Sequence, residues 1–215
     1  MNTVTGIEQI LNTLELPREL VKVSCADRKR NKKVLKGRYE IEPVTNPNKK
    51  LNFFTKKGFQ GCNLFTNNGL IIVVSDGHRQ TTLIDISTTM EQIAGRLREN
   101  EKFHNVFRNY LIHIYSTNDN IPDDKVFEEL MEQKHREAEM LMDMTKNYTN
   151  EQMNLFEQRT NLENDIVSII GSKLVFNPLK EQSFRYKQQL RSQYRNDISI
   201  ASSYRSSDRF KHAEH

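Results

Sequence analysis

Two short stretches of this 215-residue chain combine glycines with residues that bind phosphate groups. The first runs from Thr55 to Asn63 and reads TKKGFQGCN, with Gly58 and Gly61 three residues apart. Glycine has no Cβ, so a turn that contains it can bring its backbone N–H groups close to a phosphate. The spacing therefore predicts a phosphate-binding turn at the end of a strand.

The second stretch covers residues 92–98 and reads QIAGRLR. Thr88, followed three residues later by Glu91, has the pattern of a capping box, which predicts that a helix begins here. At 100° per residue, this helix presents Gly95 and Arg96 on the face opposite its apolar residues, so Arg96 points outward. A guanidinium group suits phosphate because its rigid fork makes two charge-assisted hydrogen bonds at once.

The elements that must position these stretches alternate between strands and helices over the first 117 residues. Apolar spacing predicts a helix that ends at Pro17, a basic helix that ends near Gly37 and a helix over 88–100. Strands separated by helices favour a parallel sheet, and residues 70–75 are apolar on both faces, as in a buried parallel strand. The expected strands are 20–25, 51–55, 70–75 and 111–116. The predicted fold class is therefore α/β.

A mainly α-helical extension is expected after residue 119. Residues 124–147 carry an interrupted, methionine-rich apolar stripe, which is typical of a helix packed on a core. Further helices are expected over 149–164 and near 180–195, and residues 197–215 are expected to be weakly ordered. The predicted division is 1–119, 120–196 and 197–215.

The charge of the chain is unevenly distributed. Residues 18–60 hold thirteen Lys and Arg against four Asp and Glu, and residues 120–165 hold five against twelve. A basic block is typical of a protein that binds nucleic acid. A solvated lysine-rich surface explains the same composition, so charge alone leaves both interpretations open.

Composition excludes several other classes. Apolar residues make up 36% of the chain, against a usual ~45–50%, and no apolar run reaches the ~18 residues of a membrane span. We expect a cytoplasmic protein without a membrane partner. Cys25 and Cys62 are too few for a disulfide framework, and no Cys/His cluster has the spacing of a metal site, so both are expected to be reduced thiols.

Taken in order, TKKGFQGCN and QIAGRLR resemble motifs V and VI in the second RecA-like domain of superfamily two helicases. The intervening sequence is similar to helicase-like proteins carried by mobile elements and phages of Bacteroidota. The resemblance covers about residues 2–117 and implies a partial RecA-like parallel sheet flanked by helices. The implied activity is that of an ATP-dependent nucleic-acid helicase.

The first motif implies contacts to nucleic acid and to nucleotide. Thr55 falls where the family places a threonine that contacts nucleic acid, and Lys56 and Lys57 are expected to grip the same backbone. Gly58, Gly61 and Asn63 are expected near the nucleotide. Asn63 stands where an aspartate is more frequent in the family.

The second motif implies what this chain contributes to ATP hydrolysis in the complete helicase. Arg96 matches the family's arginine finger, Gln92 is expected to contact the nucleotide, and Arg98 is expected to assist Arg96. The usual second arginine lies one residue later, where this chain has Glu99.

The phosphate loop GxxxxGK[ST] and a DExx box are absent from the 215 residues. These motifs hold the triphosphate and its Mg²⁺. The chain is therefore expected to be the C-terminal part of a helicase that is inactive alone, with ATP and Mg²⁺ bound only in the complete helicase. Its expected partners are single-stranded DNA or RNA and the first RecA-like domain of the same or another chain.

Two alternatives remain open. The chain could be a non-catalytic module, derived from a helicase, that binds nucleic acid or a protein partner. It could also be a structural protein that assembles through its helical extension.

Overall fold

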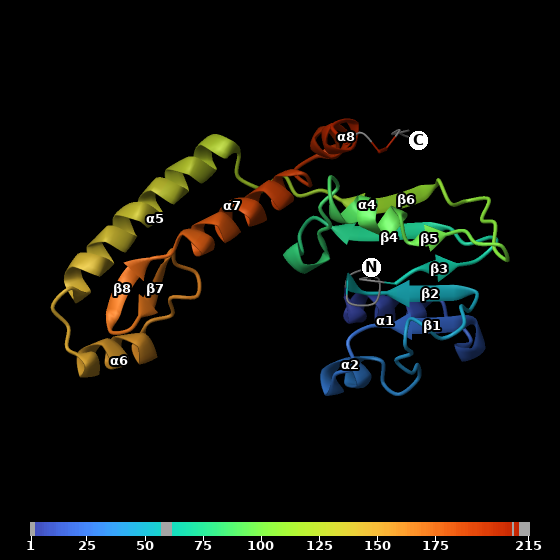
Figure 1. Cartoon of the computed structure of the whole chain (residues 1–215), viewed down its shortest axis with the longest axis horizontal. Coiled ribbons are helices and arrows are strands. Elements are labelled where there is room, and N and C mark those ends of the chain that lie inside the picture. Colours follow the sequence, from blue (N-terminus) through green and yellow to red (C-terminus); the bar gives the residue numbers. More distant parts are fainter. Residues whose placement is uncertain (1–2, 57–61, 208, 211–215) are drawn as a thin grey trace. The chain divides into compact units, whose positions relative to one another are not determined.

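The computed structural model describes residues 3–56, 62–207 and 209–210. These residues form two compact units (Figure 1). The first unit contains residues 1–118 and 193–215, and the second contains residues 119–192. The boundaries differ from the expected division because the chain returns to the first unit after the second is complete.

Parallel strand pairs form the framework of the first unit. β1 (Val21–Ser24) pairs with β2 (Leu51–Phe54), and β4 (Ile71–Asp76) pairs with β6 (Leu111–Ser116). A third parallel pair joins β3 (Leu64–Phe65) to β5 (Leu97–Arg98), each only two residues long. The unit therefore has the α/β character that the sequence predicts.

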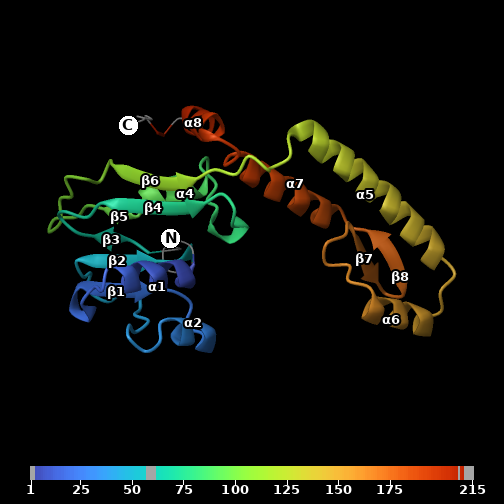
Figure 2. The same cartoon turned by 180° about the vertical axis from the view of Figure 1, so that it is seen from behind.

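The four expected strands do not join in one sheet. In the described part of the chain they belong to two separate two-stranded sheets, and the β3–β5 pair is a third. Figures 1 and 2 show the pairs following one another from β6 and β4 through β5 and β3 to β2 and β1. With two residues each, β3 and β5 pair only with each other, and no ladder between the three pairs is present in the described residues.

Helices complete the first unit. The helix α1 (Val4–Thr13) begins at Thr3, whose side chain accepts a hydrogen bond from the Gly6 N–H. A second, α2 (Lys29–Val34), is the expected basic helix. The short 3₁₀ turns η1 (Arg18–Leu20) and η2 (Gln80–Thr82) precede β1 and follow β4.

The residues of α1 and β1 explain where one core lies. Apolar side chains at helical spacing on α1 face β1, which is buried on both faces. The buried cluster consists of Ile7, Leu11, Val21, Val23, Leu35 and Tyr39. This cluster fixes the end of β1 and, through the strand pairing, the end of β2.

β4 is only half buried, contrary to the sequence expectation. Val73 and Ser75 are buried, whereas Ile72 is 52% exposed. On the paired strand β6, Ile112 and Ile114 are also exposed. One face of the β4–β6 pair therefore packs on the core, and its other, apolar face remains open to solvent.

The helix expected over 88–100 is much shorter. In the structure α4 spans only Thr89–Ala94 and ends at Gly95. The backbone carbonyl of Arg96 then accepts a hydrogen bond from Leu64 N–H at 2.8 Å, and Leu97 pairs with Leu64. The pairing of β5 with β3 thus overrides the helical periodicity of the sequence.

The predicted capping box is also wrong. The side chain of Thr88 makes no capping hydrogen bond to α4. The carboxylate of Glu91 is instead occupied by Ser207 Oγ at 2.7 Å and by Arg209 Nε at 3.3 Å. Glu91 therefore ties the C-terminal segment to α4.

That segment includes α8 (Asp197–Arg205), so this part of the expected weakly ordered tail is helical. Asn196 caps the helix by accepting the Ser199 N–H at 2.8 Å. Ile200 and Tyr204, four residues apart, are both buried. Burial of this apolar edge explains why a Ser-rich sequence forms an ordered helix.

The second unit joins three helices and a hairpin. The helices are α5 (Asp124–Thr145), α6 (Asn150–Arg159) and α7 (Pro178–Ser192). The antiparallel hairpin of β7 (Val167–Ile170) and β8 (Lys173–Phe176) turns at Gly171, which has a positive φ of 62°. Their shared core consists of Phe127, Met131, Ala138, Met153, Ile166, Val167 and Leu174. The expected stripe of α5 is only partly confirmed, because Phe127 and Met131 are buried in this core whereas Met140 and Met144 are 72% and 53% exposed.

In the described part of the chain, none of the helices combines the length and apolar composition needed to cross a membrane.

Candidate functional site

Thr55 directly follows β2, as the sequence predicts. Its backbone N–H donates to the Ser24 carbonyl at 3.2 Å, so the β1–β2 pairing fixes its position. The Thr55 residue is only 8% exposed, so little of it is open to the nucleic-acid contact that the resemblance implies. The exposed residue Lys56 follows it, whereas the predicted residues Lys57, Gly58 and Gly61 lie outside the described residues.

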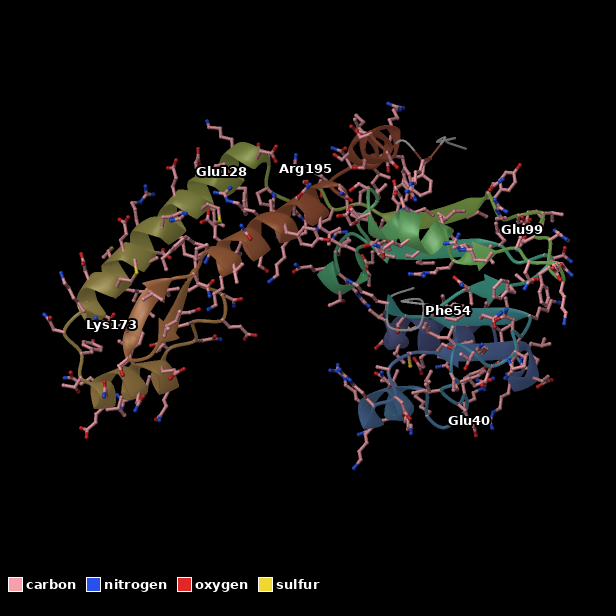
Figure 3. The ribbon with its side chains drawn as sticks, viewed as in Figure 1. Glu40, Phe54, Glu99, Glu128, Lys173 and Arg195 are labelled. Atoms are coloured by element: carbon pink, nitrogen blue, oxygen red, sulfur yellow. The ribbon has the colours of Figure 1, made fainter. Side chains whose placement is uncertain are left out.

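Arg96 lies at the junction between α4 and β5. Its Nη1 donates to the backbone carbonyl of Cys62 at 3.4 Å. In Figure 3 the labels of Phe54 and Glu99 help to locate the two stretches, because Phe54 directly precedes Thr55 and Glu99 directly follows Arg98 in the sequence. The arginine therefore contacts the segment of the first motif, and the expectation that a helix aims it outward is wrong.

A second nitrogen of this side chain, Nε, points to a further role. Arg96 Nε is buried and has no hydrogen-bond partner among the residues that the structure describes. A buried, unpaired guanidinium nitrogen is costly, because burial removes its water without replacing the hydrogen bond to that water. An incoming anion could satisfy this group.

Arg96 also affects the electrostatics of its neighbour. Burial raises the pKa of the Cys62 thiol, and the positive charge of Arg96 opposes this effect by favouring the thiolate. Cys62 therefore stays mainly a thiol at neutral pH.

A pocket of about 430 Å³ adjoins Arg96. It brings together the predicted residues Gln92, Arg96 and Arg98, and Gly95 lies beside them. The other lining residues are Ser87, Thr88, Glu91 and Arg209. We call this cavity the arginine pocket.

The charge of the arginine pocket is positive. Three guanidinium groups face it, and the single carboxylate, Glu91, already pairs with Arg209 and accepts from Ser207. The Arg209 side chain is 75% exposed, so its ion pair contributes at most about 1 kcal/mol. A phosphate group could therefore compete for Arg209 at little cost.

Asn63 does not join the arginine pocket. It lines a different cavity of about 560 Å³, together with residues 44–48, residues 64–68 and Phe103. The structure thus separates Asn63 from Gln92, although both were expected to contact one nucleotide.

Arg209 and Glu91 were missed as site residues by sequence reasoning. Residue 209 lies more than a hundred positions after Glu91, so their ion pair depends on tertiary packing. Among the residues that the structure describes, no group of three or more His, Cys, Asp and Glu could hold a metal ion.

Comparisons with protein-family models, with curated proteins and with solved structures found no match to this chain.

Proposed function

We propose that the chain is the C-terminal portion of an ATP-dependent nucleic-acid helicase and supplies an arginine finger to an ATP site completed by another RecA-like domain. The observation that carries this proposal is the hydrogen bond from Arg96 to the Cys62 carbonyl, beside a pocket lined by three arginines. It brings the segments of the two helicase-like motifs together. The parallel β1–β2 pairing, which ends one residue before Thr55, is compatible with a RecA-like sheet.

In this proposal Arg96 contacts the terminal phosphate of ATP. The transition state of phosphoryl transfer spreads negative charge over the phosphoryl oxygens, and a preorganised guanidinium stabilises that charge. The contact to Cys62 O holds the guanidinium group beside the pocket, and its Nε has no hydrogen-bond partner among the described residues. Arg98 and Arg209 add positive charge to the same pocket.

The residues of the arginine pocket fit phosphate and do not fit Mg²⁺. Its one carboxylate is engaged by Ser207 and Arg209, and magnesium is usually held by carboxylates together with substrate phosphates. We therefore assign the metal ion and the adenosine part of ATP to the other RecA-like domain.

The basic block of the first unit is proposed to contact the backbone of single-stranded nucleic acid. Lys56 follows β2, and the buried residue Thr55 orders the end of that strand. Such contacts bind phosphates without reading sequence.

The proposal is tested with inorganic triphosphate as the probe and the full 215-residue chain. Isothermal titration calorimetry compares the wild type with Arg96→Ala, Arg96→Lys and the control Arg136→Ala, an exposed arginine of α5. Removing the fork of Arg96 should weaken binding by about ten- to a hundredfold, because a charge-assisted hydrogen bond contributes about 1.5–3 kcal/mol. Lysine should restore only part of the affinity, since it lacks the fork.

Equal affinities of Arg96→Ala and Arg136→Ala for triphosphate would contradict the assignment of Arg96. Thermal unfolding of both variants, followed by circular dichroism, shows whether a decrease in binding reflects the site or the fold.

A further inference from the structure

The cavity that contains Asn63 differs in chemistry from the arginine pocket. Its lining contains no ionisable side chain, but it contains five asparagines and two phenylalanines. The asparagines are Asn46, Asn48, Asn63, Asn67 and Asn68, and the phenylalanines are Phe65 and Phe103. We call this cavity the amide pocket. Its volume of about 560 Å³ lies within the usual range of roughly 300–1,000 Å³ for small-molecule sites.

One wall of the amide pocket is held by a buried lysine. Lys22 is fully buried, and its Nζ donates hydrogen bonds to the backbone carbonyls of Val44, at 2.8 Å, and Asn46. Asn48 Nδ2 donates to the Phe65 carbonyl at 3.2 Å. Because a buried ammonium group needs such partners, Lys22 fixes the segment 44–48 in place.

The opposite wall is held by Asn67. Its Oδ1 accepts from His104 N–H at 3.0 Å, and its carbonyl accepts from Val106 N–H at 3.3 Å. These bonds keep Phe103 beside Phe65, with ring centroids 6.3 Å apart and ring planes inclined by 34°. The two rings therefore offer adjacent aromatic surfaces on the wall of the cavity.

Two amides of the pocket remain available to a ligand. Asn63 and Asn68 are exposed, and their side chains have no hydrogen-bond partner in the described ranges. Each carboxamide offers a donor and an acceptor side by side, and this pair matches the hydrogen-bonding edge of a nucleobase. Aromatic rings next to such amides stack on the flat face of a base.

The charge around the amide pocket indicates where the base comes from. Residues 44–48 lie within the basic block 18–60, which holds thirteen Lys and Arg against four Asp and Glu. The exposed lysine Lys50 lies two residues after this wall. A neutral cavity beside basic residues suits a nucleic-acid strand, because one base can enter the cavity while the phosphates stay outside near the basic residues.

We propose that the amide pocket receives one nucleobase of single-stranded nucleic acid. The inference rests on the proposed helicase function and adds a contact that the two motifs do not supply. Phe103 stacks on the base, and Asn63 and Asn68 bind its edge. The charged arginine pocket takes phosphate instead.

Fluorescence anisotropy with a labelled single-stranded DNA oligonucleotide tests this inference on the full chain. The variants are Phe103→Ala and Asn63→Ala, with Phe107→Ala as the control. Phe107 is an exposed phenylalanine of the same loop that does not line the cavity. Phe103→Ala should weaken binding about tenfold, because base stacking on an aromatic ring is worth roughly 1–3 kcal/mol. The salt dependence of DNA binding by Phe103→Ala should equal that of the wild type, since stacking releases no counterions.

An oligonucleotide of the same length without bases is the second probe. The wild type and Phe103→Ala should bind it equally, since no base remains to stack. If Phe103→Ala, Asn63→Ala and the wild type bind the base-containing oligonucleotide equally, the proposal that the amide pocket receives a base is overturned. The proposed helicase function is then unaffected. Absence of any oligonucleotide binding by the wild type would overturn both.

Adenosine monophosphate, used alone, shows whether the base that the pocket receives comes from a free mononucleotide or from a single strand. Binding of the mononucleotide that disappears in Phe103→Ala, with unchanged oligonucleotide affinity, would overturn the assignment to single strands. Asn63 is exposed, so Asn63→Ala keeps the test valid even where Phe103→Ala impairs folding.

Discussion

Arg96 donates a hydrogen bond to the backbone carbonyl of Cys62, 34 positions earlier in the chain, at 3.4 Å. This contact joins the segment after β2 to the junction between α4 and β5. It gives the two glycine-containing stretches a common location in the first unit.

The purified 215-residue chain should not hydrolyse ATP, with or without single-stranded DNA. The reason is that the phosphate loop and DExx box, which hold the triphosphate and its metal ion, are absent from this sequence. A phosphate-release assay checks the prediction. Turnover that DNA stimulates and that Arg96→Ala abolishes would contradict it.

Replacing Gly95 by alanine should leave folding intact while weakening triphosphate binding. Gly95 has an ordinary φ of −72°, and a Cβ there would meet only the Glu91 carbonyl, at 3.4 Å, and the Gln92 carbonyl, at 3.7 Å. The added methyl group would stand at the arginine pocket. Thermal unfolding and calorimetric titration of Gly95→Ala measure the two effects.

Gly37→Ala is the contrasting variant for stability. Gly37 has a positive φ of 65°, which alanine adopts at a cost of about 1–2 kcal/mol. This variant should unfold at a lower temperature but bind triphosphate normally. A decrease in stability in Gly95→Ala as large as that of Gly37→Ala would show that Gly95 has a structural role.

The stability of the first unit should decrease as the pH falls from about 6.5 towards 4. His113 lies 2.8 Å from the Tyr204 hydroxyl and 3.1 Å from Ser75 Oγ, and the rings of Tyr115 and Tyr194 are near it. Burial lowers its pKa from 6.5 to about 4. The neutral imidazole of His113 is thus favoured in the folded state. In the unfolded chain, the same imidazole takes up a proton once the pH falls below the ordinary histidine pKa of 6.5.

The contribution of His113 is therefore complete above pH 6.5 and declines as the pH falls through this range, by up to about 3 kcal/mol. Urea unfolding at pH 7.5 and pH 5 measures the decline. His113→Gln should lose less free energy of unfolding over the same interval. An identical pH dependence in this variant and the wild type would assign the effect to other groups.

Replacing Lys56 and Lys57 together by alanine should weaken binding of single-stranded DNA and flatten its dependence on salt. Removing one lysine–phosphate interaction should reduce the slope of log K against log salt by about one unit. Lys125→Ala with Lys146→Ala, two lysines of the second unit, is the control. If the salt slope of the Lys56 and Lys57 variant equals that of the control, these lysines belong to a solvated surface.

The sequence predicted those elements that have long apolar patterns. The apolar runs at residues 20–25, 51–55, 70–75 and 111–116 correspond to β1, β2, β4 and β6. By contrast, β3 and β5 have only two residues each, too few to show a period. The spacing of Ile93 and Leu97 fits a helix, so sequence reasoning extended α4 through β5.

The hairpin of the second unit had a local signal that was not used. Gly171 and Ser172 separate two short apolar runs, a pattern that favours a two-residue hairpin turn. The return of α8 to the first unit had no comparable signal. It depends on packing between distant residues, such as Tyr194 OH, which donates to the Ile84 carbonyl at 2.8 Å.

The candidate site was predicted only in part. The sequence located Gln92, Arg96 and Arg98 near one another because they are close along the chain. It could not show that Glu91 binds Arg209, or that Asn63 lies in a separate cavity, since both facts depend on tertiary contacts.

The NMR resonance of the Arg96 side-chain Nε–H tests the central claim most directly. The signal is assigned by its disappearance in Arg96→Lys, and inorganic triphosphate is then added to the full chain. Because this Nε is buried without a partner in the described structure, we predict a saturable shift of its resonance as it donates to the anion. A resonance that stays unchanged while triphosphate shifts only the signals of other arginines would contradict the assignment of Arg96 as the phosphate-binding residue.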